Sequence, residues 1–234
     1  MKKFIPLSIV FIALFSSCSK DQIKGNGEIV KNNRNLSSFS SIEANDGIEL
    51  ILTKSITEKV EVETYSNIQQ YILTSIVGNK LVIKLSKENI NVNILKVYVS
   101  AINCEKIVAN DGCNVNATNT LDFTNFKVNV NDGSKFIANI VTMSFEGILS
   151  NGSTINLSGT SDATKLISTD GSIFKDYGYA TNTFNCNVKD GGNVKITVNQ
   201  TLDVIASDGS EINYKGNGTI NSSNLTSGAT LNHK

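Results

Sequence analysis

A row of acidic residues is the first candidate for chemistry in this chain. Aspartate or asparagine precedes glycine at regular intervals, in a ladder of Asp111, Asp132, Asn151, Asp170, Asp190 and Asp208. Stacked carboxylates supply the oxygen ligands that Ca²⁺ prefers, which makes this row a candidate cation site. The structural alternative is that each side chain caps its own turn through a local hydrogen bond. The chain lacks the dense glycine-rich nonapeptide of calcium-binding β-rolls, which counts against calcium.

Side chains that act in acid–base or nucleophilic catalysis are scarce. The sequence has one histidine, His233, close to its end, and one arginine, Arg34, ahead of the repeats. No Ser-His-Asp or Cys-His set can be assembled from these residues. We therefore predict that the protein is not an enzyme. The alternative is a polysaccharide lyase or hydrolase, which would need carboxylates and lysines in one groove.

The four cysteines fall into three kinds of environment. Cys18 follows an apolar segment near the N-terminus and is a candidate for lipidation. Cys186 occupies a position that is apolar in neighbouring repeats, so we expect a buried thiol. Cys104 and Cys113 fall off the inward register on either side of a turn, and they are a candidate disulfide in an oxidising compartment. No CxxC pair with a nearby histidine indicates zinc, and the sequence leaves the identity of any metal unknown.

The elements that must position these residues repeat along the chain. From Gly112 to Gly228 the corner glycines follow one another at spacings of 21, 19, 19, 20, 18 and 19 residues. Glycine adopts positive φ without a Cβ penalty, and aspartate or asparagine tolerates it, so each dipeptide predicts a sharp corner. A nearly constant period of this length is typical of solenoid proteins.

The residues on both sides of each corner alternate as half-buried strands do. Three positions after the glycine, the residues are apolar in every copy: Leu50, Val115, Phe136, Ile155, Phe174, Val194, Ile212 and Leu231. Only one corner per repeat is strongly marked, whereas an antiparallel meander needs turn signals at both ends of each hairpin. The pattern therefore favours an all-β parallel solenoid with coils of about 19–20 residues over a meander or a sandwich.

Residues 55–100 interrupt the period, because no Asp-Gly corner occurs within them. The pattern there predicts strands at 59–64 and 81–85, a helical turn at 67–72, a hairpin corner at Gly78-Asn79 and an extended segment at 91–100. An open solenoid end presents unpaired backbone and apolar surface, so it needs a cover. We predict that this stretch is an N-terminal β-rich cap or a set of elaborated first coils, ahead of regular coils at 101–234. The alternative is an independent ligand domain.

The N-terminus has the three parts of an export signal. Two lysines precede an apolar run at residues 4–15, and two serines then lead into Cys18. The run is too short for a membrane-spanning helix, which needs about 20 residues. The segment resembles the lipobox of bacterial lipoproteins, in which the cysteine receives diacylglycerol, although Phe15 stands where leucine is usual. We predict a signal peptide at 1–17, a lipidated tether at 18–26 and a single domain at 27–234, with an ordinary secretory signal as the alternative.

Several short motifs occur together as they do in one known family. They are Gly25-Asn26-Gly27-Glu28-Ile29-Val30, Phe39-Ser40-Ser41-Ile42 ahead of Asp46-Gly47-Ile48-Glu49-Leu50, and later turns such as Asp132-Gly133-Ser134 and Asp208-Gly209-Ser210. On these motifs, nearly all of the chain after residue 18 resembles the head GIN domain family of adhesin-like proteins. The resemblance implies a right-handed parallel β-helix, and many members look like lipoproteins or secreted proteins of Bacteroidetes. It brings no catalytic or binding residues with it, so it predicts fold rather than function.

The expected role is that of a noncatalytic protein of the outer membrane or cell surface. A lipid anchor would attach it to the membrane, and a long regular face would contact a glycan or another protein. The charge is balanced, with 21 basic and 21 acidic side chains, so no clustered Lys and Arg indicate a nucleic acid partner. An envelope scaffold without a small ligand is a further alternative beside the polysaccharide-active enzyme. No cofactor is expected apart from the candidate Ca²⁺.

Overall fold

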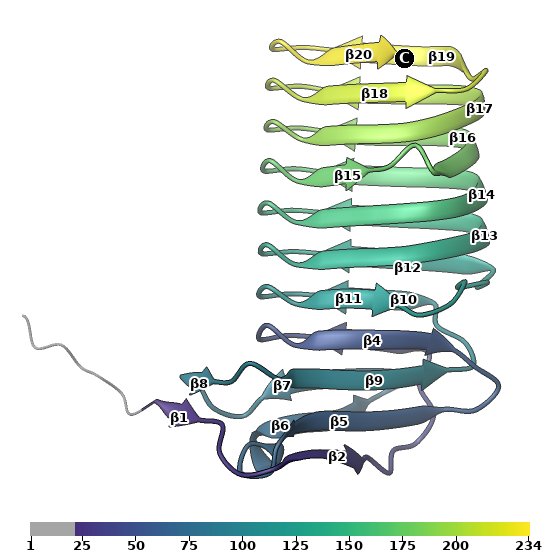
Figure 1. Cartoon of the computed structure of the whole chain (residues 1–234). Helices are drawn as coiled ribbons and strands as arrows, with labels where there is room; N and C mark the ends of the chain where they lie inside the picture. Colours follow the sequence, from purple (N-terminus) through teal and green to yellow (C-terminus); the bar gives the residue numbers. More distant parts are fainter. Residues whose placement is uncertain (1–21) are drawn as a thin grey trace, which may run out of the picture.

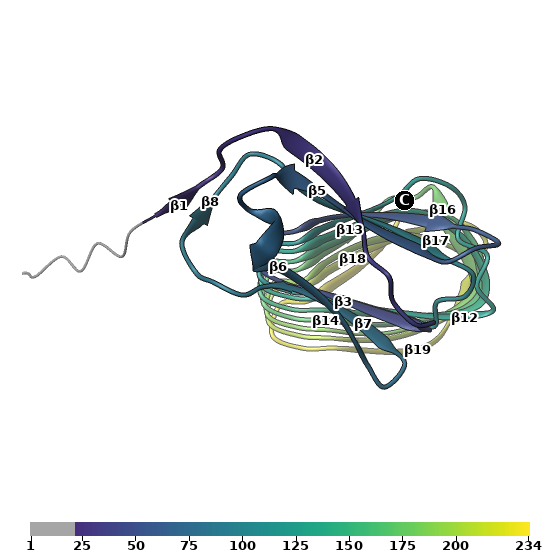
Figure 2. The same cartoon turned by 90° about the horizontal axis from the view of Figure 1, so that it is seen from below.

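The computed structural model describes residues 22–234, which form a stack of β-coils (Figure 1). Cys18 and the predicted signal peptide at 1–17 lie outside the described residues. Two faces of strands meet at a sharp edge, and a rounded side joins them opposite that edge (Figure 2). No helix in residues 22–234 is long and apolar enough to cross a membrane.

The strands divide between these faces and an N-terminal cap. The front face, toward the viewer in Figure 1, contains β4 (Glu49–Lys54), β9 (Leu95–Ala101), β11 (Asn114–Ala117), β15 (Ile173–Lys175), β18 (Glu211–Lys215) and β20 (Thr230–His233). The back face contains β3 (Ser41–Ala44), β7 (Lys80–Leu85), β10 (Lys106–Ala109), β12 (Asn125–Val130), β16 (Tyr179–Val188) and β19 (Thr219–Leu225). Three long strands run from the front face around the rounded side to the back face: β13 (Lys135–Leu149), β14 (Thr154–Ser168) and β17 (Asn193–Ala206). The cap contains β1 (Ile23–Lys24), β2 (Ile29–Asn33), β5 (Lys59–Tyr65), the 3₁₀ helix η1 (Gln69–Tyr71), β6 (Ile72–Val77) and β8 (Ile90–Asn91).

Equivalent residues of successive coils are paired neighbours. β13 pairs in parallel with β14 from Lys135↔Thr154 to Leu149↔Ser168, and the later coils continue the same register. Each coil therefore adds about 4.8 Å, the spacing between hydrogen-bonded strands. The predicted parallel β-solenoid is confirmed, with about seven turns that rise in a right-handed sense (Figure 1).

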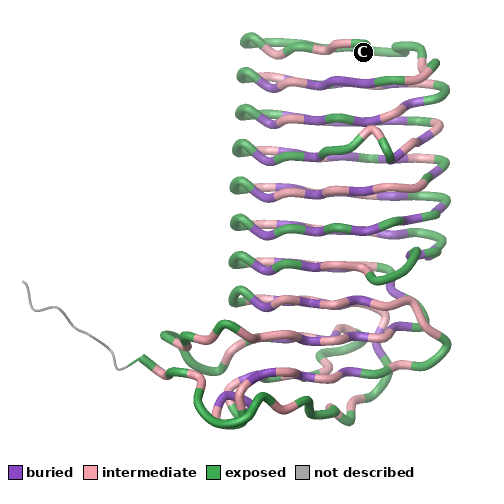
Figure 3. Tube along the Cα trace, in the orientation of Figure 1, coloured by how far each residue is buried: buried purple, intermediate pink, exposed green. Residues whose placement is uncertain are grey.

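The core lies between the two faces and follows the predicted inward positions. Zero exposure is found at Leu50, Val115, Phe136, Ile155, Phe174, Val194 and Ile212. Within this core Phe145 packs against Phe174 and Tyr179, with ring centroids 6.4 and 6.0 Å away. Burial of each large apolar side chain contributes about 1.5–3 kcal/mol. Along the strands buried and exposed positions alternate, whereas the corners of the sharp edge are exposed (Figure 3).

Residues 55–100 build the lower end of the same sheet, and their order in space differs from their order in the chain. β7 pairs with β3 and β9 pairs with β4, while β3 and β4 also pair with β10 and β11. The coil of residues 41–54 therefore lies between strands of residues 80–101 and 106–117. Antiparallel strands β5, β2 and β6 then end the stack. Val60 and Ile72 belong to the same core cluster as the coils, so this stretch has no separate core.

Candidate functional site

The predicted row of Asp and Asn residues forms the sharp edge of the solenoid. φ lies between 53° and 55° at Asp111, Asp132, Asn151, Asp170, Asp190 and Asp208. In each turn the residue after the glycine closes a hydrogen bond, as Ser134 N donates to Asn131 O at 3.1 Å. The glycine itself donates to the next coil, as Gly133 N does to Asn151 O at 3.0 Å. The row thus supplies the left-handed conformation that keeps the backbone ladder continuous around a tight turn.

Several side chains of this row form hydrogen bonds with neighbouring side chains. Asn151 Nδ2 donates to Asp132 Oδ1 at 2.7 Å, and Thr169 Oγ1 donates to Asp170 Oδ2 at 2.6 Å. Thr169 lies in the turn of Asp170, as the turn-capping alternative requires, but it donates from its side chain, whereas Asn151 reaches Asp132 from the next coil. In residues 22–234 no three His, Cys, Asp or Glu side chains are placed to hold a metal ion. The contacts therefore support a structural role for the row.

The cysteines of the described chain are free, buried thiols. Cys186 faces the core, as expected. Cys104 and Cys113 were expected to fall off the inward register, but both have zero exposure. They are not joined, since Cys104 Sγ donates to Lys106 O at 3.4 Å while backbone groups at Gly47 and Ile48 bond the other thiol. Burial raises the pKa of each of the three thiols to about 12, so all are protonated at neutral pH.

The sole histidine and arginine lie at opposite ends of the solenoid. His233 stacks on Tyr214 in the last coils, with ring centroids 4.6 Å apart, and its Nε2 lies 2.9 Å from Gly216 O. Arg34 lies in the cap, where its Nη2 donates to Gln69 Oε1 at 2.9 Å. Desolvation lowers the pKa of Arg34, and its buried Nε has no hydrogen-bond partner. The two residues do not form a common site.

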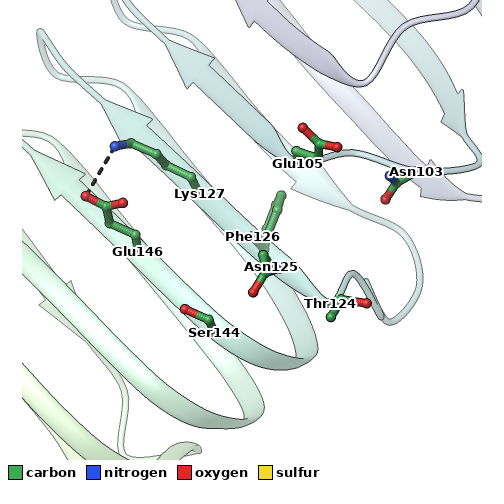
Figure 4. Close-up of a pocket in the computed structure, with 8 residues that line it drawn as sticks. All are labelled: Asn103, Glu105, Thr124, Asn125, Phe126, Lys127, Ser144 and Glu146. Atoms are coloured by element: carbon green, nitrogen blue, oxygen red, sulfur yellow. Dashed lines mark ion pairs between the residues drawn. The ribbon is translucent and has the colours of Figure 1, made fainter.

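An open groove of about 370 Å³ lies on the back face, across the coils that contain β10, β12 and β13 (Figure 4). Polar residues from neighbouring coils line it: Asn103 and Glu105 ahead of β10, Thr124 and Asn125 at the start of β12, and Ser144 and Glu146 in β13. Residues 102–105 and 118–124 leave the regular coil here, which opens the space.

Backbone contacts hold the walls of this groove. Lys127 N donates to Glu105 O at 2.9 Å, which ties the first wall to β12. Thr124 O accepts from Ser144 N at 3.2 Å and from Thr142 Oγ1 at 2.8 Å, which ties β12 to β13. The irregular segments are therefore anchored on both sides, and the groove is part of the rigid solenoid.

The groove offers hydrogen-bond donors and acceptors, together with charge. Lys127 Nζ lies 3.2 Å from Glu146 Oε1, the ion pair drawn in Figure 4, and Lys165 Nζ lies 3.9 Å from the same oxygen. Glu105 is exposed on the opposite wall. Phe126 is 2% exposed and faces the core, so no aromatic ring is presented for stacking. Such a site suits a ligand rich in hydroxyl or amide groups.

The sequence did not predict this groove, because its residues come from separate coils and from irregular segments. The one signal was the spacing from Gly112 to Gly133, which at 21 residues is the longest of the series. The extra residues fall in the segment 118–124 that forms part of the wall.

Comparisons with known proteins agree with this architecture. Residues 38–218 match the family model described as "Putative auto-transporter adhesin, head GIN domain". No curated protein matches the chain. Among solved structures, a "putative adhesin" from Bacteroides fragilis has 17% identity and a TM-score of 0.78, over 91% of this chain and 100% of that one. A "putative adhesin" from Parabacteroides merdae has 18% identity and a TM-score of 0.70, over 92% of this chain and 100% of that one.

A third solved structure is similar in fold and carries a different description. It is a "Putative lipid binding protein" from Parabacteroides distasonis, with 16% identity, a TM-score of 0.74, and coverage of 92% of this chain and 100% of that one. At such identities the likeness to these three proteins is a likeness of fold alone.

Proposed function

The chain belongs to the head GIN domain family, and on that premise we propose that it is a noncatalytic binding module of the bacterial surface or envelope. A lipid on Cys18 anchors it to the outer membrane, and the solenoid contacts a glycan or a protein through its outer surface. The adhesin description of the family, and of two similar structures, supports a binding role.

The groove of Figure 4 is the observation that carries this proposal. It is open and rigid, and its walls present amide, hydroxyl, carboxylate and ammonium groups. A preformed polar site of this kind orders few groups on binding, so more of the contact energy is kept as affinity. An extended ligand can enter such a groove from the side, as a glycan chain or a protein loop would.

A polysaccharide-active enzyme is the second candidate, and the same groove favours it. Glu105, Glu146 and Lys127 lie in one groove, which is the combination that a lyase or hydrolase on this scaffold needs. The ion pair between Lys127 and Glu146 argues for binding, because it engages the lysine and one of the two carboxylates with each other. The two functions are distinguished by testing whether the polysaccharide is cleaved into shorter products.

A glycan array and a bacterial adhesion assay test the proposal. Residues 22–234 contain all of the described sheet and core, so this lipid-free segment is used. We expect it to bind a defined set of glycans or cells, and Glu105→Gln with Asn125→Ala to weaken binding by about tenfold or more. The control, Glu58→Gln with Asn114→Ala, makes the same chemical changes at residues that do not line the groove. Silence in both assays would reject the proposal in favour of the scaffold alternative.

The anchor has its own test. In the full chain, Cys18→Ala is expected to abolish incorporation of labelled fatty acid and to release the protein from the membrane fraction. Retention of label by the variant would contradict the predicted lipobox and leave an ordinary secretory signal.

A further inference from the structure

Three lysines of the front face form no ion pair with any residue that the structure describes. In residues 22–234 the ion pairs involve lysines from Lys31 to Lys165. The later front-face residues Lys175, Lys195 and Lys215 are exposed, and none lies within 4.0 Å of a carboxylate oxygen of the described part of the chain. The positive charge of this part of the front face is therefore left uncompensated by close pairs.

The register brings these three lysines together. Phe174 pairs with Val194 across neighbouring coils, so Lys175 and Lys195, which follow them, project from adjacent coils in the same direction. Thr197 pairs with Lys215, so the third lysine lies on the next coil, displaced by two residues along the strand. Neighbouring coils are about 4.8 Å apart, so Lys175 and Lys195 stand side by side along the solenoid axis, and Lys215 lies one coil further on and to one side. Like charges on neighbouring coils repel each other, so an anion that bridges them is stabilising.

An aromatic ring lies at one end of this cluster. Lys215 Nζ stands over the ring of Tyr177, 4.6 Å from its centroid. Tyr177 lies in the loop between β15 and β16 that leaves the front face, visible in Figure 1. Thr197 Oγ1 donates to Tyr177 O at 2.8 Å, and Gly178 N donates to Asp176 Oδ1 at 2.9 Å, so the loop is held in place.

The carboxylates near the cluster are already engaged with N–H groups. Glu211 accepts from Asn193 Nδ2 at 3.2 Å and from Asn213 Nδ2 at 2.8 Å. Asp176 accepts from the backbone of its own loop. Both carboxylates are thus satisfied without the lysines, which stay available to an external anion.

From this arrangement we propose that Lys175, Lys195 and Lys215, with Tyr177, bind a linear acidic polysaccharide along the solenoid axis. The inference rests on the proposed binding function and adds a place and a ligand class to it. The lysines repeat coil by coil, as carboxylates repeat along a uronate chain. Asn156 neighbours Lys175 in the register, and its half-buried amide can bond sugar hydroxyls.

A membrane surface fits the same cluster less well. Peripheral attachment of a folded surface combines basic residues with apolar side chains that enter the lipid. Here the column beside the lysines carries one exposed isoleucine, Ile173 at 37%, between the polar residues Thr154 and Asn193. The ring of Tyr177 is covered by Lys215 and half-buried, so it does not project as an anchor.

Binding to polygalacturonate tests the proposal, with neutral dextran as the uncharged polymer and phosphatidylglycerol-containing phosphatidylcholine vesicles as the membrane arm. The protein is residues 22–234, and affinity is measured by calorimetry at low and physiological salt. Each ammonium near an anionic surface contributes about a factor of five, so Lys→Gln at all three positions is expected to weaken binding by about 100-fold. The control replaces Lys24, Lys84 and Lys106, which removes the same charge elsewhere and should leave affinity within about twofold.

Salt-sensitive binding of polygalacturonate that the front-face variant loses and the control keeps would support the proposal. Equal loss in both triple variants would overturn it, because net charge alone would then explain binding. Binding to the vesicles with none to polygalacturonate would also overturn it. Failure of this test with a positive glycan array or adhesion assay rejects the lysine site alone, whereas silence in all of them rejects the binding function as well.

Discussion

Gly152 N donates a hydrogen bond to the carbonyl oxygen of Asp170 at 2.9 Å, which joins the same corner of two successive coils. The contact depends on φ of +68° at the glycine and 54° at the aspartate. Corners of this kind recur along the sharp edge and keep the ladder continuous where the two faces meet. The sharp edge therefore stabilises the solenoid through its backbone hydrogen bonds more than through its carboxylates.

Two glycines with positive φ are expected to respond differently to substitution. A Cβ at Gly152 meets nothing within 4 Å. Gly152→Ala should therefore lower the free energy of unfolding only by the cost of the left-handed conformation for alanine, about 1–2 kcal/mol. A Cβ at Gly159 would lie 2.0 Å from Ile140 O, so Gly159→Ala must displace the neighbouring coil and is expected to cost at least about 3 kcal/mol. Urea unfolding, monitored by circular dichroism, compares the stability of the two variants. Equal midpoints for the two variants would contradict this account of the coil contact.

The thiols give a direct test of the cysteine assignments. Cys104, Cys113 and Cys186 are buried and free, so the folded protein from residue 22 onward should not react with a thiol reagent at pH 8. After denaturation without reductant we expect three thiols per chain. A count of one would mean that Cys104 and Cys113 had formed the disulfide that the structure does not contain.

The protein is expected to lose stability at high pH because of Tyr179. Its hydroxyl bonds Ser161 and Thr164 in the core, and burial raises its pKa from 10.0 to about 12. The folded state therefore holds the proton more tightly than the unfolded state. The stability that the protonated Tyr179 hydroxyl contributes is fully present below about pH 10 and is lost as the pH rises toward 12. Unfolding free energy measured from pH 8 to 11 should fall less steeply in Tyr179→Phe.

The same variant has an effect at neutral pH. Loss of the buried hydroxyl contacts is expected to reduce the unfolding free energy of Tyr179→Phe by about 1–2 kcal/mol. Tyr177→Phe is the control, since that ring is half-buried on the front face and the change should stay within about 0.5 kcal/mol. An identical pH profile for wild type and Tyr179→Phe would show that this tyrosine does not govern the alkaline loss.

Calcium is expected to leave the protein unchanged. The carboxylates of the sharp edge bond neighbouring side chains at Asp132 and Asp170, and the described residues contain no three-ligand cluster. Thermal melting with millimolar Ca²⁺ or with chelator should give the same midpoint. A midpoint that rises with calcium concentration would restore the ladder as a cation site.

The coil architecture could be predicted because each repeat carries its own local signals. The Asp-Gly corners need positive φ, and the third residue after each glycine faces the core, as Phe136 and Ile155 do. We did not predict that the residue directly after each corner glycine faces inward, so Cys113 was placed off the inward register. The signal for this position was small residue size, since the equivalent residues Ser134, Ser153 and Ser172 are small and fully buried at the turn.

Contacts between distant segments could not be predicted in the same way. Asn110 Nδ2 donates to Asn45 Oδ1 at 2.9 Å, because the coil of residues 41–54 is stacked directly beneath residues 106–117. The two segments share an Asn-Asp-Gly corner, but the sequence does not place them on adjacent coils, since the residues between them have lost the repeat. The groove is opened by the irregular segments 102–105 and 118–124, which lack the repeat, so its residues Glu105 and Asn125 had no shared sequence pattern to reveal them.

The central claim, that the solenoid binds a ligand without transforming it, is tested most directly on the strongest polysaccharide from the array. Bound protein and free reducing or unsaturated ends are measured in the same mixture over time. The account predicts saturable binding, reduced by Glu105→Gln with Asn125→Ala, and a constant number of chain ends. A steady release of new chain ends that Glu105→Gln or Glu146→Gln abolishes would contradict it and establish the groove as an active site.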